Sequence, residues 1–338
     1  MSRSGNTPKV AREFSSARAN MTKEQQTASG KLTLAIIIDC CTPGAIFLSA
    51  LAPAVLGLFF AIETGVSLSI PLVIFSLLIP VLFNASINLI NDYFDYVQGN
   101  DTKDNIFGET DSPLAFNQIK NPKPIFWIGL LCLIIGGFLG IYIIYKTNFI
   151  PLIIGIIGAI SVLTYSGGKF SVSYLPIGEI VAGFVMGGLI SLGVFVSLTG
   201  YIDWTILIKS IPMMLIVSQF MLVNNTCDIE RDKIVGRRTL PIILGRDKIH
   251  SVAALFTLIW IISLLFSSIF WYYFGCPIVI IMIILLRKRF VTIYTGLRLS
   301  STKIPDVLNM VVVATAVGIC YPISILIHIL IIKLLAVQ

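Results

Sequence analysis

The chain has 338 residues, of which 56% are hydrophobic and only 12% are charged, and its mean hydropathy is +0.93. Because a soluble domain carries about 25% charged residues, this composition argues against a soluble enzyme. The net charge of +7 does not indicate a nucleic-acid-binding protein, since the cytoplasmic loops of membrane proteins carry the same excess of Lys and Arg. We therefore expect an all-α integral membrane protein.

Apolar segments begin only after a polar N-terminal stretch. Residues 1–31 are rich in Ser, Thr, Lys and Arg, which predicts a disordered cytoplasmic tail, and residues 32–338 are expected to form a single transmembrane domain. In that domain we expect nine transmembrane helices, at residues 33–62, 68–96, 124–145, 149–166, 176–199, 204–226, 250–273, 275–286 and 307–335. The eighth is short against the roughly 20 residues that a span needs. It either extends through the basic run at 287–289, whose side chains would snorkel, or is tilted little.

The basic residues are distributed unevenly between the connecting segments. With the N-terminus in the cytoplasm and the spans alternating, the cytoplasmic segments hold 21 of the 24 Lys and Arg residues. The positive-inside rule therefore favours a cytoplasmic N-terminus and an outside C-terminus. This orientation predicts a multi-pass protein of the cell membrane whose second and sixth spans both end on the cytoplasmic side.

Two acidic motifs stand at the ends of those two spans. Both contain the pattern Asn-x-x-x-Asp, which pairs Asn91 with Asp95 and Asn224 with Asp228, and the second motif continues to Asp232. Residues four apart share one face of a helix, so the second motif predicts a polar ladder over two helical turns. Acids beside a bilayer core are costly, and their presence in both halves of the chain predicts one shared cation site.

The chemistry of these side chains points to a hard metal ion. Carboxylate and amide oxygens are the ligands that Mg²⁺ prefers, and it is often shared between protein carboxylates and substrate phosphates. A carboxylate cage at the mouth of an apolar cavity therefore predicts a lipid diphosphate as ligand. Asn88 and Asp92 repeat the spacing of the first motif on a face rotated by about 60°, so spacing alone leaves open which pair faces inward.

Basic residues stand where a diphosphate would need them. Lys233, Arg237 and Arg238 follow the second motif, and Lys169 follows the fourth span. Alternatively, these side chains serve only the positive-inside distribution and bind no ligand. The acids of the loop after the second span are expected to be solvated; they are Asp104, Glu109 and Asp111.

Glu179 lies one turn into the fifth span, after Pro-Ile-Gly. Its carboxylate serves either as a base or hydrogen-bond acceptor for an aromatic hydroxyl, or only as an acid that the helix macrodipole favours near an N-terminus. Glu63, at the outer end of the first span, is expected to have no role.

Together these motifs resemble those of the UbiA superfamily of intramembrane aromatic prenyltransferases. The resemblance covers roughly residues 40–330. It is carried by Asn-Asp-Tyr-Phe-Asp and the following Gly-Asn-Asp at 91–101, Tyr-Ser-Gly-Gly at 165–168, Gly-Glu at 178–179, and the second acidic motif with Gly-Arg-Arg-Thr-Leu-Pro at 224–245. The segments at 165–168 and 224–245 are most similar to the MenA branch, the 1,4-dihydroxy-2-naphthoate polyprenyltransferases of menaquinone biosynthesis.

The resemblance implies nine transmembrane helices around a central cavity, with an active site that opens to the cytoplasm. It also implies Mg²⁺-dependent transfer of a polyprenyl group from its diphosphate to an aromatic acceptor, which in the MenA branch is 1,4-dihydroxy-2-naphthoate and gives demethylmenaquinone. The residues that match Mg²⁺ ligands by position are Asp92, Asp95, Asp101, Asp228 and Asp232. The remaining matched residues are Asn91 and Asn224 for the metal diphosphate, Lys169, Lys233 and Arg237 for the diphosphate, and Tyr165 beside the allylic cation.

The chain departs from the family pattern at several positions. The family often has Arg-Pro-x-Thr before the first span, and here Cys-Cys-Thr-Pro at 40–43 stands there without the Arg. Cys227 stands where Arg often precedes the second-motif Asp, and Lys169 replaces a Pro of the MenA branch. A different aromatic acceptor is therefore an alternative. A cation- or proton-coupled transporter is an alternative of another class, but its carboxylates are expected near the middle of the bilayer.

Overall fold

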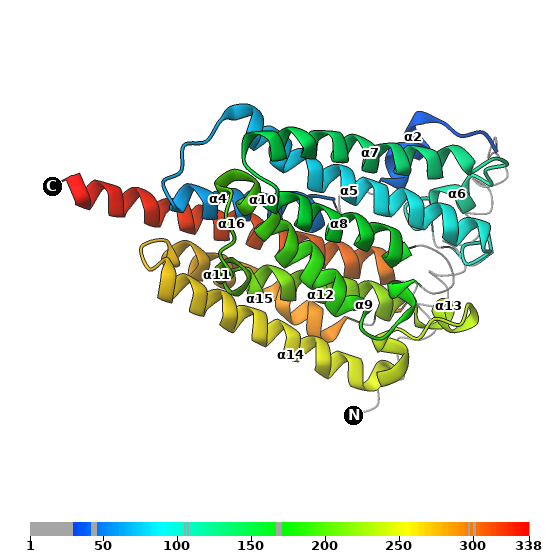
Figure 1. Ribbon diagram of the computed structural model, residues 1–338. Coiled ribbons are helices and arrows are strands. Elements are labelled where there is room, and N and C mark those ends of the chain that lie inside the picture. The colour runs from blue at the N-terminus through cyan, green and yellow to red at the C-terminus, as the bar shows by residue number, and fades with distance from the viewer. Residues whose placement is uncertain are drawn as a thin grey trace, which may run out of the picture.

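The computed structural model of the protein describes residues 30–41, 46–104, 106, 108–166, 171–296, 298–299 and 302–337. These residues form a bundle of helices that run roughly side by side, and no strand occurs among them (Figure 1). The expectation of an all-α protein is therefore confirmed. The predicted tail at 1–31 lies almost wholly outside the described residues.

The first apolar segment is not one regular helix. Helix α2 spans Leu34–Cys40, and the π-helix η1 at Phe47–Leu51 leads directly into α4 at Ala52–Glu63. Pro53 has no N–H to donate to the preceding turn, and the wider π turn stands immediately before it. The irregularity of this segment therefore has a local cause in the sequence.

Helices α5 (Ile70–Val97) and α7 (Lys123–Lys146) pack along each other, with α8 (Ile150–Ser166) beside them (Figure 1). The short helix α6 (Pro113–Phe116) lies in the connection between α5 and α7. A Cβ added at Gly136 of α7 would lie 2.7 Å from the Phe83 ring, so this glycine permits the close approach of the two helices.

The fifth predicted span is a continuous helix made of α9 (Gly178–Ala182), the π-helix η4 (Gly183–Leu189) and α10 (Ile190–Thr199). It packs on α12 (Ile211–Cys227), and a Cβ at Gly187 would lie 2.5 Å from the Met214 Cα. The 3₁₀ turn η3 (Val172–Tyr174) precedes α9, and the short helices α11 (Thr205–Lys209) and α13 (Ile229–Ile234) flank α12.

Three long helices complete the bundle: α14 (Leu240–Trp271), α15 (Cys276–Thr295) and α16 (Lys303–Val337). Gly245 has a φ of +75°, which separates the first turn of α14 from the rest by a kink. Helix α15 continues through the basic run at 287–289, as the first of the two alternatives for the short eighth segment predicted.

In the part of the chain that the structure describes, five helices are long and apolar enough to cross a membrane: Ile70–Val97, Lys123–Lys146, Gly178–Thr199, Leu240–Trp271 and Lys303–Val337. Three shorter apolar stretches are also helical: Phe47–Glu63, Ile150–Tyr165 and Ile211–Cys227. With α15, these place a helix in each of the nine predicted segments. The helices support a membrane location, and the number of spans and the orientation of the termini stay predictions.

An ion pair joins helices at the end of the bundle where α4 finishes. The Lys209 ammonium, on a residue only 9% exposed, donates to both oxygens of Glu63 at 3.0 and 3.1 Å. The Tyr272 hydroxyl donates to Glu63 at 3.0 Å, and the Tyr321 hydroxyl donates to the Lys209 carbonyl at 2.8 Å. Glu63 therefore has a structural role that the sequence did not predict, because its carboxylate connects α4 to α11 and to Tyr272, the residue that follows α14.

Candidate active site

The first acidic motif lies at the end of α5, where the helix is terminated by a left-handed glycine. Gly99 has a φ of +76°, the Gly99 N–H donates to the Tyr96 carbonyl at 3.2 Å, and the Asn100 N–H donates to the Asp95 carbonyl at 2.9 Å. These two bonds define a Schellman motif. The chain therefore folds back at once, and Asp101 also donates its N–H to the Asp95 carbonyl, at 3.1 Å.

The second acidic motif is interrupted rather than continuous. Helix α12 ends at Cys227, and Asp228 has a φ of −97° and a ψ of 8° before α13 begins. The predicted two-turn ladder is therefore broken at Asp228. Helix α13 then ends in a second Schellman motif, in which Gly236 has a φ of +80° and the Arg237 N–H donates to the Asp232 carbonyl at 2.9 Å.

The Arg237 guanidinium connects the two motifs. One of its terminal nitrogens lies 2.6 Å from Asp95 Oδ1 and the other lies 3.2 Å from Asp232 Oδ1. Asp95 is 9% exposed and Asp232 is 1% exposed, so the bridge is largely shielded from water. The structure thus brings Asp95, Asp232 and Arg237 together at the end of the bundle where α6, α9 and α13 lie (Figure 1).

A second set of ion pairs surrounds Asp228. The Arg231 guanidinium and the Lys303 ammonium each lie 2.9 Å from Asp228 Oδ2, although Lys303 comes from the start of α16. The same two cations pair with Asp111, and Arg231 also lies 3.5 Å from Asp101. The Asp111 side chain is only 2% exposed, so the prediction that it is a solvated loop acid is wrong.

Two buried carboxylate oxygens are left over in this cluster. Asp228 Oδ1 and Asp232 Oδ2 have no hydrogen-bond partner among the described residues, and Asp228 itself is only 4% exposed. Each carboxylate is held through its other oxygen by Arg or Lys. Unpartnered buried acceptors are rare in proteins and indicate a site for an additional donor or cation.

The charge balance of the cluster also indicates a site for a cation. Among the described residues, three cations pair with five carboxylates, those of Asp95, Asp101, Asp111, Asp228 and Asp232. Within this set, the excess of two negative charges equals the charge of one divalent cation. Burial raises the pKa of Asp232 to about 6, although Arg237 opposes the rise, and burial raises the pKa of Asp101 to about 6 against the effect of Arg231.

These observations fit a hard metal ion in donor chemistry, because carboxylate oxygens are the ligands that Mg²⁺ prefers. Within the described ranges, however, no three His, Cys, Asp or Glu side chains converge closely enough to form a complete metal cage. Arg237 lies between two of the candidate ligands, Asp95 and Asp232. The arrangement therefore offers carboxylate oxygens and negative charge to a cation, while the Arg237 guanidinium occupies the space between two of the candidate ligands.

The other residues of the first motif take different positions. The Asn91 amide donates to Asp95 Oδ2 at 3.0 Å, so it orients that carboxylate. Asp92 accepts a hydrogen bond from the Cys40 thiol of α2 and therefore faces a different neighbour from Asp95. Asn100, which belongs to the Gly-Asn-Asp run but was assigned no role from the sequence, donates to Asp95 Oδ1 at 2.8 Å and is 7% exposed.

Of the predicted diphosphate-binding residues that the structure describes, Arg237 lies in the cluster and Lys233 does not. Lys233 is exposed on α13, and no ion pair joins it to an acid of the cluster within the part of the chain that the structure describes. Lys169 lies outside the described residues. Asn224 is half-buried on α12, one turn before Asp228. The cations that lie next to Asp228 are instead Arg231 and Lys303, neither of which was predicted from the sequence to bind the diphosphate.

Glu179 is deeply buried at the start of α9. It is 1% exposed, its Oε1 accepts a hydrogen bond from the Asn225 amide at 2.9 Å, and its Oε2 has no partner among the described residues. Asn225 therefore fixes the carboxylate and leaves one oxygen for another group. Tyr165, at the end of α8, lies within electrostatic range of both Glu179 and Arg237.

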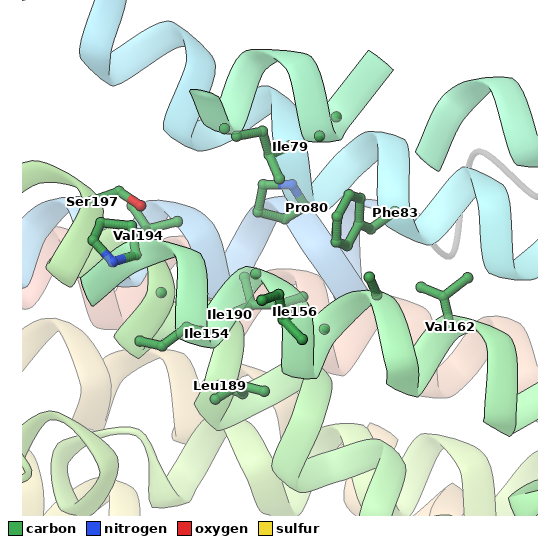
Figure 2. Close-up of a pocket in the computed structure, with 18 of the residues that line it drawn as sticks. Ile79, Pro80, Phe83, Ile154, Ile156, Val162, Leu189, Ile190, Val194 and Ser197 are labelled. Carbon is green, nitrogen blue, oxygen red and sulfur yellow. The ribbon is translucent and has the colours of Figure 1, made fainter. Parts of the chain in front are cut away.

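An apolar cavity of about 310 Å³ lies between α5, α7, α8 and the helix formed by η4 and α10. Figure 2 shows side chains from these elements around it, including Phe83, Ile154, Leu189 and Val194. A smaller cavity of about 40 Å³ shares Ile87, Ser161, Val185 and Met186 with it and is also lined by Tyr165. The apolar space therefore continues toward the end of the bundle that holds the acids.

Fold and site together define a helical membrane protein whose buried acidic cluster lies near an apolar cavity. A model of the UbiA prenyltransferase family matches residues 50–310. The chain is 30% identical over 248 residues to the 1,4-dihydroxy-2-naphthoate octaprenyltransferase of Bacillus subtilis strain 168, which covers 72% of this chain and 78% of that protein. It is 28% identical over 269 residues to the protein of that name from Haemophilus influenzae, over 74% of this chain and 82% of that one. The chain belongs to the UbiA prenyltransferase family.

Solved structures agree with this assignment at the level of the fold. A UbiA homolog from Archaeoglobus fulgidus bound to GPP and Mg²⁺ matches with a TM-score of 0.60 at 16% identity, over 86% of this chain and 99% of that one. The apo structure of a UbiA homolog from Aeropyrum pernix K1 matches with a TM-score of 0.61 at 15% identity, over 82% of this chain and 96% of that one. The protein is thus an enzyme that transfers prenyl groups, and the transporter alternative is set aside.

Proposed function

We propose that the enzyme transfers a polyprenyl group from its diphosphate to 1,4-dihydroxy-2-naphthoate, in the presence of Mg²⁺, and so makes demethylmenaquinone in its reduced, hydroquinone form. The observation that carries this proposal is the pair of unpartnered, buried oxygens on Asp228 and Asp232, next to three cations and an apolar cavity. This arrangement suits an amphiphile with an anionic head and an apolar chain. The similarity to the two naphthoate octaprenyltransferases supports the choice of acceptor.

The acids would hold the metal. The free oxygens of Asp228 and Asp232 are the first candidates, with Asp95 and Asp101 next to them and Asp92 and Asn224 as further candidates from the sequence. Mg²⁺ bound there would neutralise the diphosphate and make it a better leaving group. Asn91 orients Asp95, and Arg231, Arg237 and Lys303 would bind the diphosphate oxygens as they are released from the carboxylates. Lys169 and Lys233 remain further candidates for the diphosphate.

The apolar cavity would hold the prenyl chain. Its walls carry few polar groups, and an allylic cation formed near it would be shielded from water. Tyr165 lines the smaller cavity on the side of the acids, where its ring would stabilise that cation. The cavity is bounded by α5, α7, α8 and α10, so it lies on one side of the bundle.

Glu179 would accept the proton of the acceptor hydroxyl at its free Oε2 while Asn225 holds Oε1. The bond between the allylic carbon and the diphosphate oxygen breaks, and its electron pair leaves with the diphosphate. The ring carbon then forms the new C–C bond. For 1,4-dihydroxy-2-naphthoate the ring carboxylate leaves as CO₂, its bonding electrons restore the aromatic ring, and Glu179 would return the proton to the ring oxygen. An acceptor with hydrogen at that carbon would lose a proton instead.

The site is proposed to open to the cytoplasm, in a nine-span protein of the cell membrane with its C-terminus outside. The support is the charge distribution, since 21 of the 24 Lys and Arg residues fall in the segments on that side. Cysteine labelling of Lys233 and Lys333 variants in intact cells and in opened membranes would test this orientation. Equal labelling of both positions from the outside would contradict it.

The reaction is tested with membranes that contain the full chain, Mg²⁺, a polyprenyl diphosphate and a panel of aromatic acceptors. We expect prenylation of the naphthoate, its loss without Mg²⁺, and its loss in Asp228→Asn. The matched control is Glu63→Gln, which changes an ion-paired carboxylate at the other end of the bundle and should retain activity in correctly folded protein. Preferential prenylation of a different ring would reject the acceptor, and no transfer to any ring would reject the function.

A further inference from the structure

Tyr174 contacts both acidic motifs although it belongs to neither. It ends the 3₁₀ turn η3, in the connection between α8 and α9, and its side chain is half-buried. The sequence contains no pattern around Tyr174 that would single it out. Its position became apparent only from the contacts that follow.

The first contact is with the turn that ends α5. The Asn100 amide nitrogen donates to the Tyr174 hydroxyl oxygen at 2.6 Å, and the same nitrogen donates to Asp95 Oδ1 at 2.8 Å. Asn100 is buried, so these two acceptors use both hydrogens of its amide group. The hydroxyl of Tyr174 therefore fixes the side chain that holds the Asp95 carboxylate.

The other contacts are with the turn that ends α13. The Arg237 guanidinium carbon lies 4.8 Å from the centre of the Tyr174 ring, which is a cation–π distance. The Arg238 N–H donates to the Tyr174 carbonyl at 2.9 Å, so the backbone of this turn is also attached to η3. One residue therefore contacts the side chain that follows the left-handed glycine in each motif.

We infer that Tyr174 is a positioning residue that fixes Arg237 and Asn100 and thereby sets how the site binds a diphosphate. An arginine between two carboxylates has several rotamers that satisfy one acid and not the other. The ring of Tyr174 restricts the guanidinium to the plane in which it reaches Asp95 and Asp232 together. The inference rests on the proposed function, because a diphosphate is the ligand that Arg237 would bind.

The test compares Tyr174→Phe and Tyr174→Leu with Tyr201→Leu. Tyr201 packs on Phe195 at a centroid distance of 5.4 Å, and its replacement removes a ring of the same kind remote from the acids. We expect Tyr174→Leu to raise the KM for polyprenyl diphosphate at least tenfold, with less than a twofold change for the aromatic acceptor. Tyr174→Phe keeps the ring beside Arg237 and should raise the KM for polyprenyl diphosphate about threefold. Tyr201→Leu should change neither constant, and equal effects on both constants in Tyr174→Leu would overturn the inference.

A double-mutant cycle separates positioning from general destabilisation. If Tyr174 acts through Arg237, then Tyr174→Leu should cause no further rise in the diphosphate KM when Arg237 is already replaced by Gln. Fully additive effects would overturn the inference. If Tyr174→Leu fails to fold, the same cycle is measured with Tyr174→Phe.

A binding measurement keeps this inference separate from the proposed function. Inorganic diphosphate with Mg²⁺ should raise the Tm of the purified full chain in detergent, and the rise should be smaller for Tyr174→Leu. If the unsubstituted chain prenylates no acceptor, the proposed function fails while this measurement still decides the role of Tyr174. An equal rise in both proteins, or none in the unsubstituted chain, would overturn the inference.

Discussion

The turns that end α5 and α13 share one backbone conformation but differ in whether their aspartate oxygens have hydrogen-bond partners. In each, an Asp is followed four residues later by a glycine with positive φ, and the next residue returns its side chain to that Asp: Asn100 to Asp95, and Arg237 to Asp232. The sequence pattern aligned Asp95 with Asp228, whereas the backbone aligns it with Asp232. The repeat in the structure is therefore offset from the repeat in the sequence by one helical turn.

The difference between the turns lies in the occupation of their oxygens. Both oxygens of Asp95 accept hydrogen bonds, from Asn91 at 3.0 Å and from Asn100 and Arg237 at 2.8 and 2.6 Å. Asp228 and Asp232 each retain one buried oxygen with no hydrogen-bond partner among the described residues. The first turn is thus saturated by the protein's own donors, and the second turn is open to a cation.

The largest expected effect follows from this difference. Asp232→Asn keeps the size of the side chain but removes a charged, unpartnered acceptor, and we expect about a 10³-fold loss of kcat/KM. Asp95→Asn should lose about tenfold less, because its oxygens already bind protein donors. Steady-state assays of both variants over a range of Mg²⁺ concentrations measure this. Equal losses, with an equal increase in the Mg²⁺ requirement, would show that the two turns contribute alike.

A smaller effect is expected at the cation that reaches the second turn from α16. Lys303→Met removes the ammonium that Asp228 and Asp111 share, so we expect a lower Tm and about a tenfold rise in the KM for polyprenyl diphosphate. Adding Asp111→Asn removes one negative charge from the cluster and should restore much of the Tm. Lys209→Met, at the ion pair with Glu63, is the control that should lower the Tm without changing that KM. A Lys303→Met protein with unchanged Tm and KM would remove this residue from the site.

The Mg²⁺ requirement of the enzyme should depend on pH, because the second turn contains Asp232. The pKa of Asp232 is raised to about 6 by burial, against the effect of Arg237, so its carboxyl becomes protonated as the pH falls through that value. A protonated carboxyl does not bind a metal ion, and the Mg²⁺ concentration for half-maximal activity should rise about tenfold for each pH unit below 6. Activity at saturating Mg²⁺ should fall much less. A Mg²⁺ requirement that is constant between pH 5 and 7.5 would contradict a role for this carboxylate in binding the metal.

Much of the fold followed from composition and periodicity. Each of the nine apolar segments contains a helix among its described residues, because in an apolar environment a chain must satisfy its backbone hydrogen bonds internally. The breaks were harder to predict, since the π-helices at Phe47–Leu51 and Gly183–Leu189 depend on how Pro53 and the glycines pack against neighbouring helices. The point at which α15 ends could not be predicted from the sequence, because its last turns contain basic residues instead of apolar ones.

The site was only partly predictable for a similar reason. The acids, Arg237 and Glu179 could be selected from local spacing, which is a property of one helix or one turn. Arg231 stands three residues after Asp228, and that spacing on a helix could have identified it. Lys303 and Asp111 could not be found this way, because they are separated from Asp228 by 75 and 117 residues and meet it only through tertiary packing.

The smallest expected effect is at the two left-handed glycines. Gly99 and Gly236 have open space where a Cβ would lie, so an Ala there costs only the strain of positive φ, about 1–2 kcal/mol. Both Ala variants should therefore lower the Tm by similar, small amounts. Gly236→Ala should reduce activity more than Gly99→Ala, because the residue after Gly236 is the charged Arg237, which connects both motifs, whereas Asn100 is uncharged and donates to the first-motif carboxylate Asp95. Gly→Asn at either position tolerates positive φ better and should recover part of the loss. If Gly99→Ala proved the more damaging variant, the first turn would have to contribute more to the site than its saturated oxygens indicate.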